Sequence, residues 1–226
     1  MNSPKVAVVS DYDRTLACES DGFRIREDVS EAVNEFSRKH VFIVASGREE
    51  KIIRKLAPNL RPTVWVLENG AKLVFQGRTV LLSTDEWMAD RDKILSKLSQ
   101  LGIEYSVGEV IIYVNGGSQK IKEVLEAVKG LGHAERNRSD VMILPRGVNK
   151  ANGVLRALKE LNFEGKIYAV GDSENDLSLF EIADVKVAVV NALDEVKRAA
   201  DIVLDKPNGL GVKELLERIY RNEETL

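Results

Sequence analysis

The chain has 226 residues, of which 44% are hydrophobic and 31% charged, and its formal net charge is -3. This length and composition predict a soluble globular protein of one large domain or two small ones. The net negative charge gives no basic surface for nucleic acid, and no apolar stretch approaches the roughly 20 residues that cross a bilayer. We therefore expect neither a nucleic acid nor a membrane as a partner.

The cysteine content and the first apolar run predict a cytoplasmic protein. The single cysteine, Cys18, cannot form an internal disulfide, which fits a reducing compartment. The first apolar run stops at Asp11, so we expect no apolar segment of a secretion signal in these residues. The sequence does not reveal the oligomeric state, and a homodimer is left open.

The first third of the chain alternates strands and helices. Short apolar, β-branched runs predict buried parallel strands, and the segments between them have helical spacing or end at proline. The expected strands are Val6–Val9, Val41–Ala45 and Val64–Leu67, and the expected helices are Val29–Lys39 and Glu49–Ala57. This strand–helix–strand order indicates a parallel sheet with right-handed crossovers.

The middle of the chain follows a different order. A hairpin of Lys72–Phe75 and Thr79–Leu82 is expected, followed by two helix–strand–strand units. The helices are expected at Trp87–Leu101 and Ser118–Leu131, and the strands at Glu104–Val107, Val110–Asn115, Ala134–Asn137 and Val141–Leu144. Hairpins between helices favour an antiparallel sheet covered on one face. We therefore interpret residues 83–148 as an inserted α+β cap domain.

The parallel pattern resumes in the last third. The expected helices are Lys150–Leu161, Leu177–Ala183, Leu193–Ala200 and Val212–Arg221, and the expected strands are Ile167–Val170, Val185–Val190 and Ile202–Leu204. The predicted fold class is therefore α/β. A doubly wound, Rossmann-like parallel sheet is built from residues 1–82 and 149–226, and the smaller cap is inserted into it.

Chemically useful side chains follow several of the predicted strands. Asp11 and Asp13 follow the first strand, Ser46 the second, and Asp172 and Asp176 a later one. Parallel strands end at one edge of a sheet, so these groups are expected to converge. Neighbouring carboxylates repel unless a cation or a shared proton lies between them, and Mg²⁺ prefers carboxylate and phosphate oxygens. For Asp11 and Asp13 alone, a polar turn that caps the next helix is the alternative.

Two more features of this edge suit an anionic ligand. Lys150 opens a helix on the same side, where its ammonium group can meet a phosphate. Backbone N–H groups after Gly171 are available at the start of the following helix. Four carboxylates with one lysine and one serine do not form a serine-hydrolase triad.

The same residues form four ordered motifs that resemble those of the haloacid dehalogenase (HAD) superfamily of phosphatases. The motifs are Asp11-Tyr12-Asp13-Arg14-Thr15-Leu16, Ser46-Gly47-Arg48, Lys150 and Gly171-Asp172-Ser173-Glu174-Asn175-Asp176. The inserted cap and the segment Glu68-Asn69-Gly70-Ala71 are similar to the Cof-type branch. Within that branch, the short cap and overall length most resemble archaeal phosphoglycolate phosphatases.

This resemblance implies a Mg²⁺-dependent phosphomonoesterase for a small phosphorylated metabolite, with 2-phosphoglycolate as the expected substrate. Asp11 would be the nucleophile that forms an aspartyl-phosphate, and Asp13 the general acid and base. The implied phosphate-binding residues are Ser46, Gly47, Lys150 and Asn175. The implied metal ligands are Asp11, Asp13, Asp172 and Asp176, together with the Tyr12 carbonyl.

Several alternatives remain open at this point. Arg14 stands where the family commonly has glycine, and it either points to solvent or reaches a substrate anion. Arg48 either serves the site or pairs with helix acids, and Asn191 either lies near the site or forms a turn. Functional alternatives are a sugar-phosphate phosphatase of the trehalose or mannosylglycerate type, a phosphomutase and, outside enzymes, a phosphoacceptor signalling module.

Overall fold

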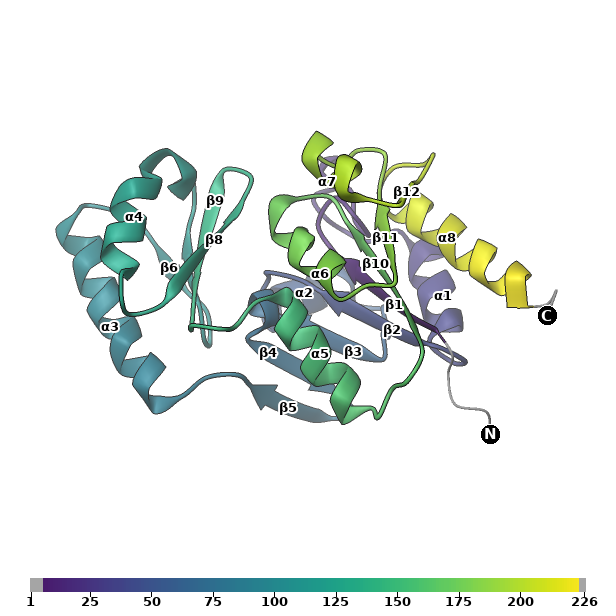
Figure 1. The fold of residues 1–226 in the computed structure, drawn as a ribbon, viewed down its shortest axis with the longest axis horizontal. Helices are drawn as coiled ribbons and strands as arrows, with labels where there is room; N and C mark the ends of the chain where they lie inside the picture. The colour runs from purple at the N-terminus through teal and green to yellow at the C-terminus, as the bar shows by residue number, and fades with distance from the viewer. Residues whose placement is uncertain (1–5, 224–226) are drawn as a thin grey trace.

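The computed structural model describes residues 6–223, which form a larger and a smaller sheet (Figure 1). Within these residues, the larger sheet has the order β12-β11-β10-β1-β2-β3-β4-β5. Its strands are β1 (Val6–Asp11), β2 (Val41–Ala45), β3 (Val64–Leu67), β4 (Lys72–Phe75), β5 (Arg78–Leu81), β10 (Lys166–Gly171), β11 (Val185–Ala188) and β12 (Ile202–Val203). Strands β12 to β3 pair in parallel and the β4–β5 hairpin is antiparallel. The predicted doubly wound α/β fold is confirmed.

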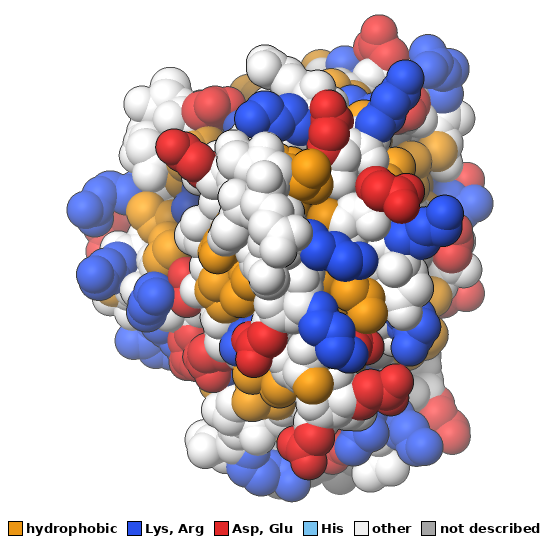
Figure 2. Space-filling model, turned by 90° about the vertical axis from the view of Figure 1, so that its left-hand side faces the viewer, with side chains coloured by type: hydrophobic (Ala, Val, Ile, Leu, Met, Phe, Trp, Pro, Cys, Tyr) orange, Lys and Arg blue, Asp and Glu red, His pale blue; other side chains and the backbone are white. Residues whose placement is uncertain are grey.

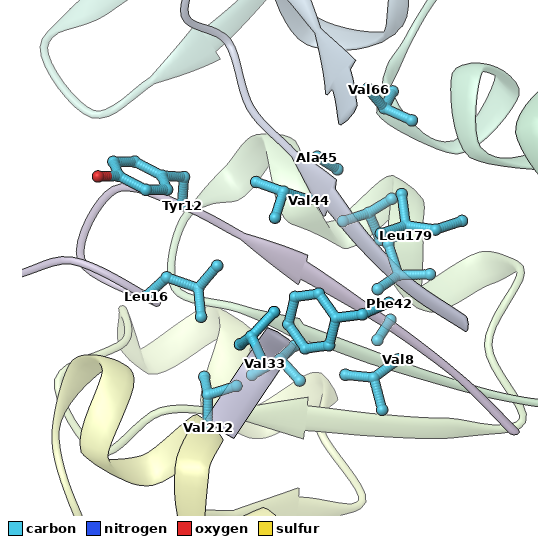
Figure 3. Close-up of a cluster of buried hydrophobic side chains, with 14 of the residues drawn as sticks. Val8, Tyr12, Leu16, Val33, Phe42, Val44, Ala45, Val66, Leu179 and Val212 are labelled. Carbon is cyan, nitrogen blue, oxygen red and sulfur yellow. The ribbon is translucent and has the colours of Figure 1, made fainter. Parts of the chain in front are cut away.

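One face of the larger sheet is covered by α1 (Glu27–Phe36) and α8 (Asn208–Glu223), which pack against each other. Figure 3 shows Val33 of α1 and Val212 of α8 close to Phe42 of β2. All three side chains are fully buried. Removing such a side chain from water stabilises a fold by about 1.5–3 kcal/mol. The apolar side chains that repeat at helical spacing in the sequence therefore form this half of the core.

Helix α5 (Lys150–Glu160) covers the opposite face. A Cβ atom on its Gly153 would lie 2.8 Å from the Val66 side chain, and Val66 is out of phase with the β2 side chains that face α1. The missing side chain at Gly153 lets α5 approach β3 closely, which brings Lys150 toward the end of β1. Shorter helices connect other strands: α2 (Glu50–Leu56), α6 (Leu177–Glu181) and α7 (Asp194–Ala199).

Strand β1 lies between β10 and β2, and this position gathers the candidate residues. Ser10 is in register with Val170 of β10, and Asp11 with Ala45 of β2. The residues that follow these three strands therefore emerge at one edge of the sheet, as the sequence predicted.

The smaller sheet forms the cap, and its strands pair antiparallel in the order β6-β7-β9-β8 within the described residues. Its elements are α3 (Asp85–Gln100), β6 (Ser106–Val107), β7 (Ile112–Val114), α4 (Ile121–Val128), β8 (His133–Asn137) and β9 (Asp140–Leu144). Figure 1 shows α3 and α4 on the side of this sheet away from the larger sheet. The cap has its own hydrophobic cluster. The inserted α+β cap is confirmed, and its boundaries at residues 83 and 148 stay a prediction.

Some cap elements are shorter than predicted. The strands expected at 104–107 and 110–115 are reduced to β6 and β7, because the N–H groups of residues 109–111 donate to the Glu68 carboxylate instead of a neighbouring strand. The helix expected from Ser118 begins as the 3-10 turn Gly117–Lys120 before it continues as α4.

The surface of the cap end carries charges of both signs. In Figure 2, Lys and Arg side chains are interspersed with Asp and Glu across this face. Within residues 6–223, no helix combines the length and the apolar character that crossing a bilayer requires.

Candidate active site

A buried lysine joins two carboxylates at the carboxyl edge of the larger sheet. Lys150, the first residue of α5, donates from Nζ to Asp11 Oδ1 at 2.5 Å and to Asp176 Oδ1 at 2.6 Å. All three side chains are almost fully buried. Asp11 ends β1 and Asp176 lies in the 3-10 turn Glu174–Asp176 after β10. The fold thus brings together Asp11 and Lys150, which are 139 positions apart in the sequence.

Asp172 completes a cluster of three carboxylates. One oxygen from each of Asp11, Asp172 and Asp176 lies within 4.8 Å of the others. Asp176 is fixed by the backbone, because its Oδ2 accepts from the N–H groups of Asp172 and Ser173 at 2.9 and 3.0 Å. A side chain at Gly171 would put a Cβ atom 2.4 Å from the Asp176 Cβ. The glycine is therefore required for the turn that positions both acids.

Burial and crowding of like charges perturb these groups. Burial raises the pKa of Asp11 well above its usual value, and the Asp176 carboxylate raises it further while Lys150 lowers it. The pKa of Asp172 is likewise raised by burial and by Asp176, with Arg138 opposing. Burial alone would lower the pKa of Lys150, but Asp11 and Asp176 raise it, so the ammonium group keeps its proton.

The donor set fits a hard divalent cation. The three buried acids supply only oxygen ligands, and oxygen is the ligand atom that Mg²⁺ prefers. Lys150 and Arg138 bring two positive charges to three carboxylates, which still leaves an excess of negative charge in a desolvated site. A divalent cation held by Asp11, Asp172 and Asp176 would remove that excess.

Asp13 lies apart from this cluster and is held by Arg48. The Arg48 Nε donates to both Asp13 carboxylate oxygens, at 2.8 and 2.9 Å, and Nη2 donates to Oδ1 at 2.7 Å. The guanidinium also lies over the Phe23 ring, 4.8 Å from its centroid. The alternative in which Arg48 pairs with helix acids is therefore wrong. Of the four acids predicted as metal ligands, Asp11, Asp172 and Asp176 lie together, whereas the Asp13 carboxylate is bound to Arg48. Metal binding by these acids stays a prediction.

Ser46 and Gly47 lie at the same edge, next to the cap. The Ser46 side chain is fully buried, and its Oγ accepts from the Arg48 N–H at 3.1 Å. The Gly47 carbonyl accepts from the Tyr113 hydroxyl of the cap at 2.8 Å, and a side chain at Gly47 would meet the sulfur of Met142 at 2.8 Å. The proximity of these residues to Asp13 and the cap is established, and phosphate binding by them stays a prediction.

The turn after β3 docks the cap onto the larger sheet. The buried Glu68 carboxylate accepts from the N–H groups of residues 109–111 at 2.9–3.0 Å. Asn69 donates to Glu135 Oε2 of β8 at 2.6 Å and accepts from Asn175 Nδ2 at 3.1 Å. Asn69 therefore links the predicted site residue Asn175 to the cap. The sequence pattern singled out this segment as a family feature, but it did not indicate the cap contacts.

Comparison with known proteins identifies the family of this chain. A profile of haloacid dehalogenase-like hydrolases matches residues 112–216. Phosphoglycolate phosphatase 2 of Saccharolobus solfataricus is 49% identical over 220 residues, which cover 97% of this chain and 94% of that protein. The chain belongs to the haloacid dehalogenase-like hydrolases. The resemblance seen in the sequence motifs is therefore confirmed.

Two further relatives agree with this HAD assignment. A phosphoglycolate phosphatase of Sulfurisphaera tokodaii is 46% identical over 218 residues, which cover 95% of this chain and 94% of that protein. The structure of a HAD/COF-like hydrolase from Plasmodium vivax has a TM-score of 0.81 at 18% identity, with 97% of each chain covered. The last comparison shows a shared fold.

One expected ligand of a HAD metal site is wrong here. The Tyr12 carbonyl oxygen accepts from the N–H groups of Leu16 and Ala17, both at 2.9 Å, so it closes its own loop instead of facing a metal. Thr15 in the same loop lies with Oγ1 3.5 Å from Asp172 Oδ1. The first HAD motif thus contacts the fourth through Thr15 and Asp172.

The Arg14 side chain is bound to Glu19 and does not extend into solvent, and the alternative that it reaches a substrate anion stays a prediction. The Arg14 φ of 61° is left-handed, a conformation that glycine adopts without steric cost, which explains why the HAD family commonly has glycine here. Its Nε donates to Glu19 Oε2 at 2.8 Å, and the guanidinium lies over the Phe23 ring. Asn191 donates to the Arg14 carbonyl at 2.7 Å, so this asparagine supports the loop that carries Asp13. No sequence signal gives the backbone conformation of an arginine.

Proposed function

We propose that this protein is a Mg²⁺-dependent phosphomonoesterase that hydrolyses 2-phosphoglycolate to glycolate and phosphate. The observation that carries the proposal is the buried cluster of Asp11, Asp172 and Asp176 around Lys150, in a chain 49% identical to a phosphoglycolate phosphatase. The cluster supports phosphoryl transfer, because that reaction depends mainly on positioning and charge neutralisation. The relative supports the choice of substrate.

Asp11 is the proposed nucleophile. One of its oxygens is held by Lys150, and the carboxylate attacks phosphorus, breaks the ester P–O bond and forms an aspartyl-phosphate. Water then attacks the same phosphorus, releases phosphate and restores the carboxylate. A bound divalent cation supplies the additional positive charge that lets an anionic phosphoryl group approach a carboxylate.

Asp13 is the proposed general acid and base. It gives a proton to the departing alcohol oxygen and later takes one from the attacking water. Arg48 fixes the orientation of the Asp13 carboxylate through its paired N–H donors. Lys150, Ser46, Gly47 and Asn175 are the proposed contacts of the phosphoryl oxygens.

The proposal predicts a specific loss in the Asp11→Asn variant. Release of phosphate from 2-phosphoglycolate should depend on Mg²⁺, stop with EDTA, and fall at least about 10⁴-fold in kcat for Asp11→Asn, because an amide is not a nucleophile toward phosphorus. Glu123→Gln, an exposed position on α4, is the matched control and should retain activity.

The same assay includes outcomes that contradict the proposal. Full activity in Asp11→Asn, or turnover that EDTA does not reduce, would remove the proposed mechanism. A requirement for a bisphosphate activator without release of phosphate would indicate a phosphomutase. A higher kcat/KM for sugar phosphates than for 2-phosphoglycolate would replace the substrate and keep the mechanism.

A further inference from the structure

One arginine of the cap reaches into the acidic cluster. Strands β8 and β9 are joined through Arg138 and Ser139, since Asn137 and Asp140 are the last residues that pair across the hairpin. Figure 1 shows β8 and β9 on the side of the cap that faces the larger sheet. Arg138 donates from Nη2 to Asp172 Oδ2 at 2.5 Å and from Nε to Ser173 Oγ at 3.3 Å.

The hairpin turn that carries Arg138 is held on both sides. Ser118 of the cap donates from Oγ to the Arg138 carbonyl at 2.8 Å and from its N–H to the Ser139 carbonyl at 3.0 Å. From the larger domain, Glu174 Oε2 accepts the Arg138 N–H at 3.1 Å. Arg138 also has a left-handed φ of 54°, which few side chains adopt unless their surroundings enforce it. These contacts fix the backbone of Arg138, and its side chain therefore extends from a fixed position beside the acidic cluster.

The carboxylate that holds Arg138 is one that a metal ion would take. Asp172 belongs to the three-carboxylate cluster, and its side chain is 1% exposed, whereas that of Arg138 is 30% exposed. A divalent cation on Asp172 would repel the guanidinium bound to the same carboxylate. The partly exposed Arg138 side chain can move away toward solvent, and the buried Asp172 side chain cannot.

The other cations of the site are already committed. Lys150 is bound by Asp11 and Asp176, and Arg48 is bound by Asp13 through three hydrogen bonds. Arg14, whose charge also acts on Asp13 and Asp172, is bound by Glu19. A guanidinium released from Asp172 would be a fork of N–H donors beside the reacting groups, and that fork matches a carboxylate. A two-carbon phosphate ester is short, so its carboxylate stays close to its phosphorus.

We propose that Arg138 binds the carboxylate of the substrate, and that its ion pair with Asp172 is the metal-free arrangement that gives way when a divalent cation binds. The substrate part of this inference rests on the proposed function. Arg138 is then the residue by which the cap distinguishes phosphorylated acids from other phosphate esters, and it also weakens metal binding until substrate is present.

Two measurements on Arg138→Gln test this proposal. Calorimetric titration with Mg²⁺ alone should give an affinity about 5-fold or more above that of the wild type, because a competing cation is gone. At saturating Mg²⁺, the ratio of kcat/KM for 2-phosphoglycolate to that for phenyl phosphate should fall at least about tenfold. Arg138→Lys should restore part of the lost preference for 2-phosphoglycolate, because lysine restores the positive charge but not the paired N–H donors of the guanidinium.

Arg136→Gln is the matched control, since Arg136 is an exposed arginine of β8, the strand that leads into the turn with Arg138, and it should change neither quantity. An unchanged Mg²⁺ affinity in Arg138→Gln would overturn the competition, and an unchanged ratio would overturn carboxylate binding. A wild-type protein that hydrolyses phenyl phosphate but not 2-phosphoglycolate would instead overturn the proposed substrate, while the Mg²⁺ titration would still decide the competition.

Discussion

Lys150 is among the largest fully buried side chains of the protein, and its ammonium group is removed from bulk water. A buried charge without partners costs several kcal/mol, so this lysine is stable there only because Asp11 and Asp176 accept its hydrogen bonds. The two carboxylates depend on the lysine for the same reason. At the scale of single residues, the candidate site is a set of charges that stabilise one another and still carry an excess of negative charge.

Arg14 gives a prediction about backbone conformation. Arg14→Gly should be more stable than Arg14→Ala by about 1 kcal/mol in urea unfolding, because both lose the contact with Glu19 but only glycine adopts a φ of 61° freely. Both variants should keep KM for 2-phosphoglycolate within about twofold, since the side chain is bound to Glu19. A similar rise of KM in both variants would mean that Arg14 contacts the substrate.

The turn from Glu68 to Gly70 connects the two sheets at the scale of secondary-structure elements. Its three residues have φ values of 48°, 54° and 102°, and left-handed residues other than glycine are each strained. A side chain at Gly70 would put a Cβ atom 1.9 Å from the Asn149 carbonyl oxygen, so α5 begins directly against this turn. Three hydrogen bonds to the Glu68 carboxylate offset the strain and fix the cap segment that leads into β7.

Glu68→Gln should weaken this connection. The amide NH₂ group would face N–H donors, so we expect a loss of about 2–4 kcal/mol in the free energy of unfolding and a higher KM for 2-phosphoglycolate. Glu109→Gln is the matched control at the same contact. Glu109 pairs with Lys72 but is half exposed, so its loss should cost less than about 1 kcal/mol. Equal losses in both variants would show that the buried carboxylate has no special role.

At the scale of the whole molecule, contacts between the cap and the larger domain surround the candidate site. Tyr113 bonds to Gly47 beside Ser46, Arg138 bonds to Asp172, and Asn69 bonds to Glu135 of the cap. The cap is thus docked against the catalytic edge through polar contacts. Such contacts can be exchanged for substrate or water at little net cost, which suits a lid over a small substrate.

Metal binding should stabilise the whole protein in a pH-dependent way. The folded-state pKa values of Asp11 and Asp172 are raised above their unfolded values. Between the unfolded and the folded pKa the folded state binds more protons, so the metal-free protein loses stability as pH rises through that window. Mg²⁺ needs ionised carboxylates, and its stabilising effect should therefore grow over the same range.

This effect is measurable as a shift in Tm. At a Mg²⁺ concentration about 100 times its Kd, the stabilisation is about 2.7 kcal/mol, or roughly 5–10 °C for a chain of this size. At one fixed Mg²⁺ concentration, we expect the shift in Tm to be larger at pH 7.5 than at pH 5. The shift should disappear with EDTA. Asp172→Asn should lose most of it. A shift of equal size at both pH values would contradict the raised pKa values.

Local patterns in the sequence determined much of this protein. Buried β-branched runs predicted the strands of the larger sheet, the change from βαβ to hairpin order predicted the cap, and polar residues after the strands predicted the edge where Asp11 and Asp172 meet. These predictions succeeded because side-chain periodicity and strand direction are properties of short segments. The motif spacing added the HAD resemblance, which the comparisons confirmed.

Only the tertiary structure decided which groups touch. That Arg48 binds Asp13 could not be predicted, because the two residues follow different strands of the larger sheet. That Glu68 accepts three cap N–H groups and that Arg138 reaches Asp172 could not be predicted, because these contacts depend on how the cap docks. The left-handed backbone at Arg14 was hidden for a related reason, since a local hydrogen-bond network enforces it against the preference of the residue. Sequence periodicity determines the helices, the strands and the edge of the sheet at which the polar residues emerge. Contacts between side chains from distant segments depend on the whole packed fold.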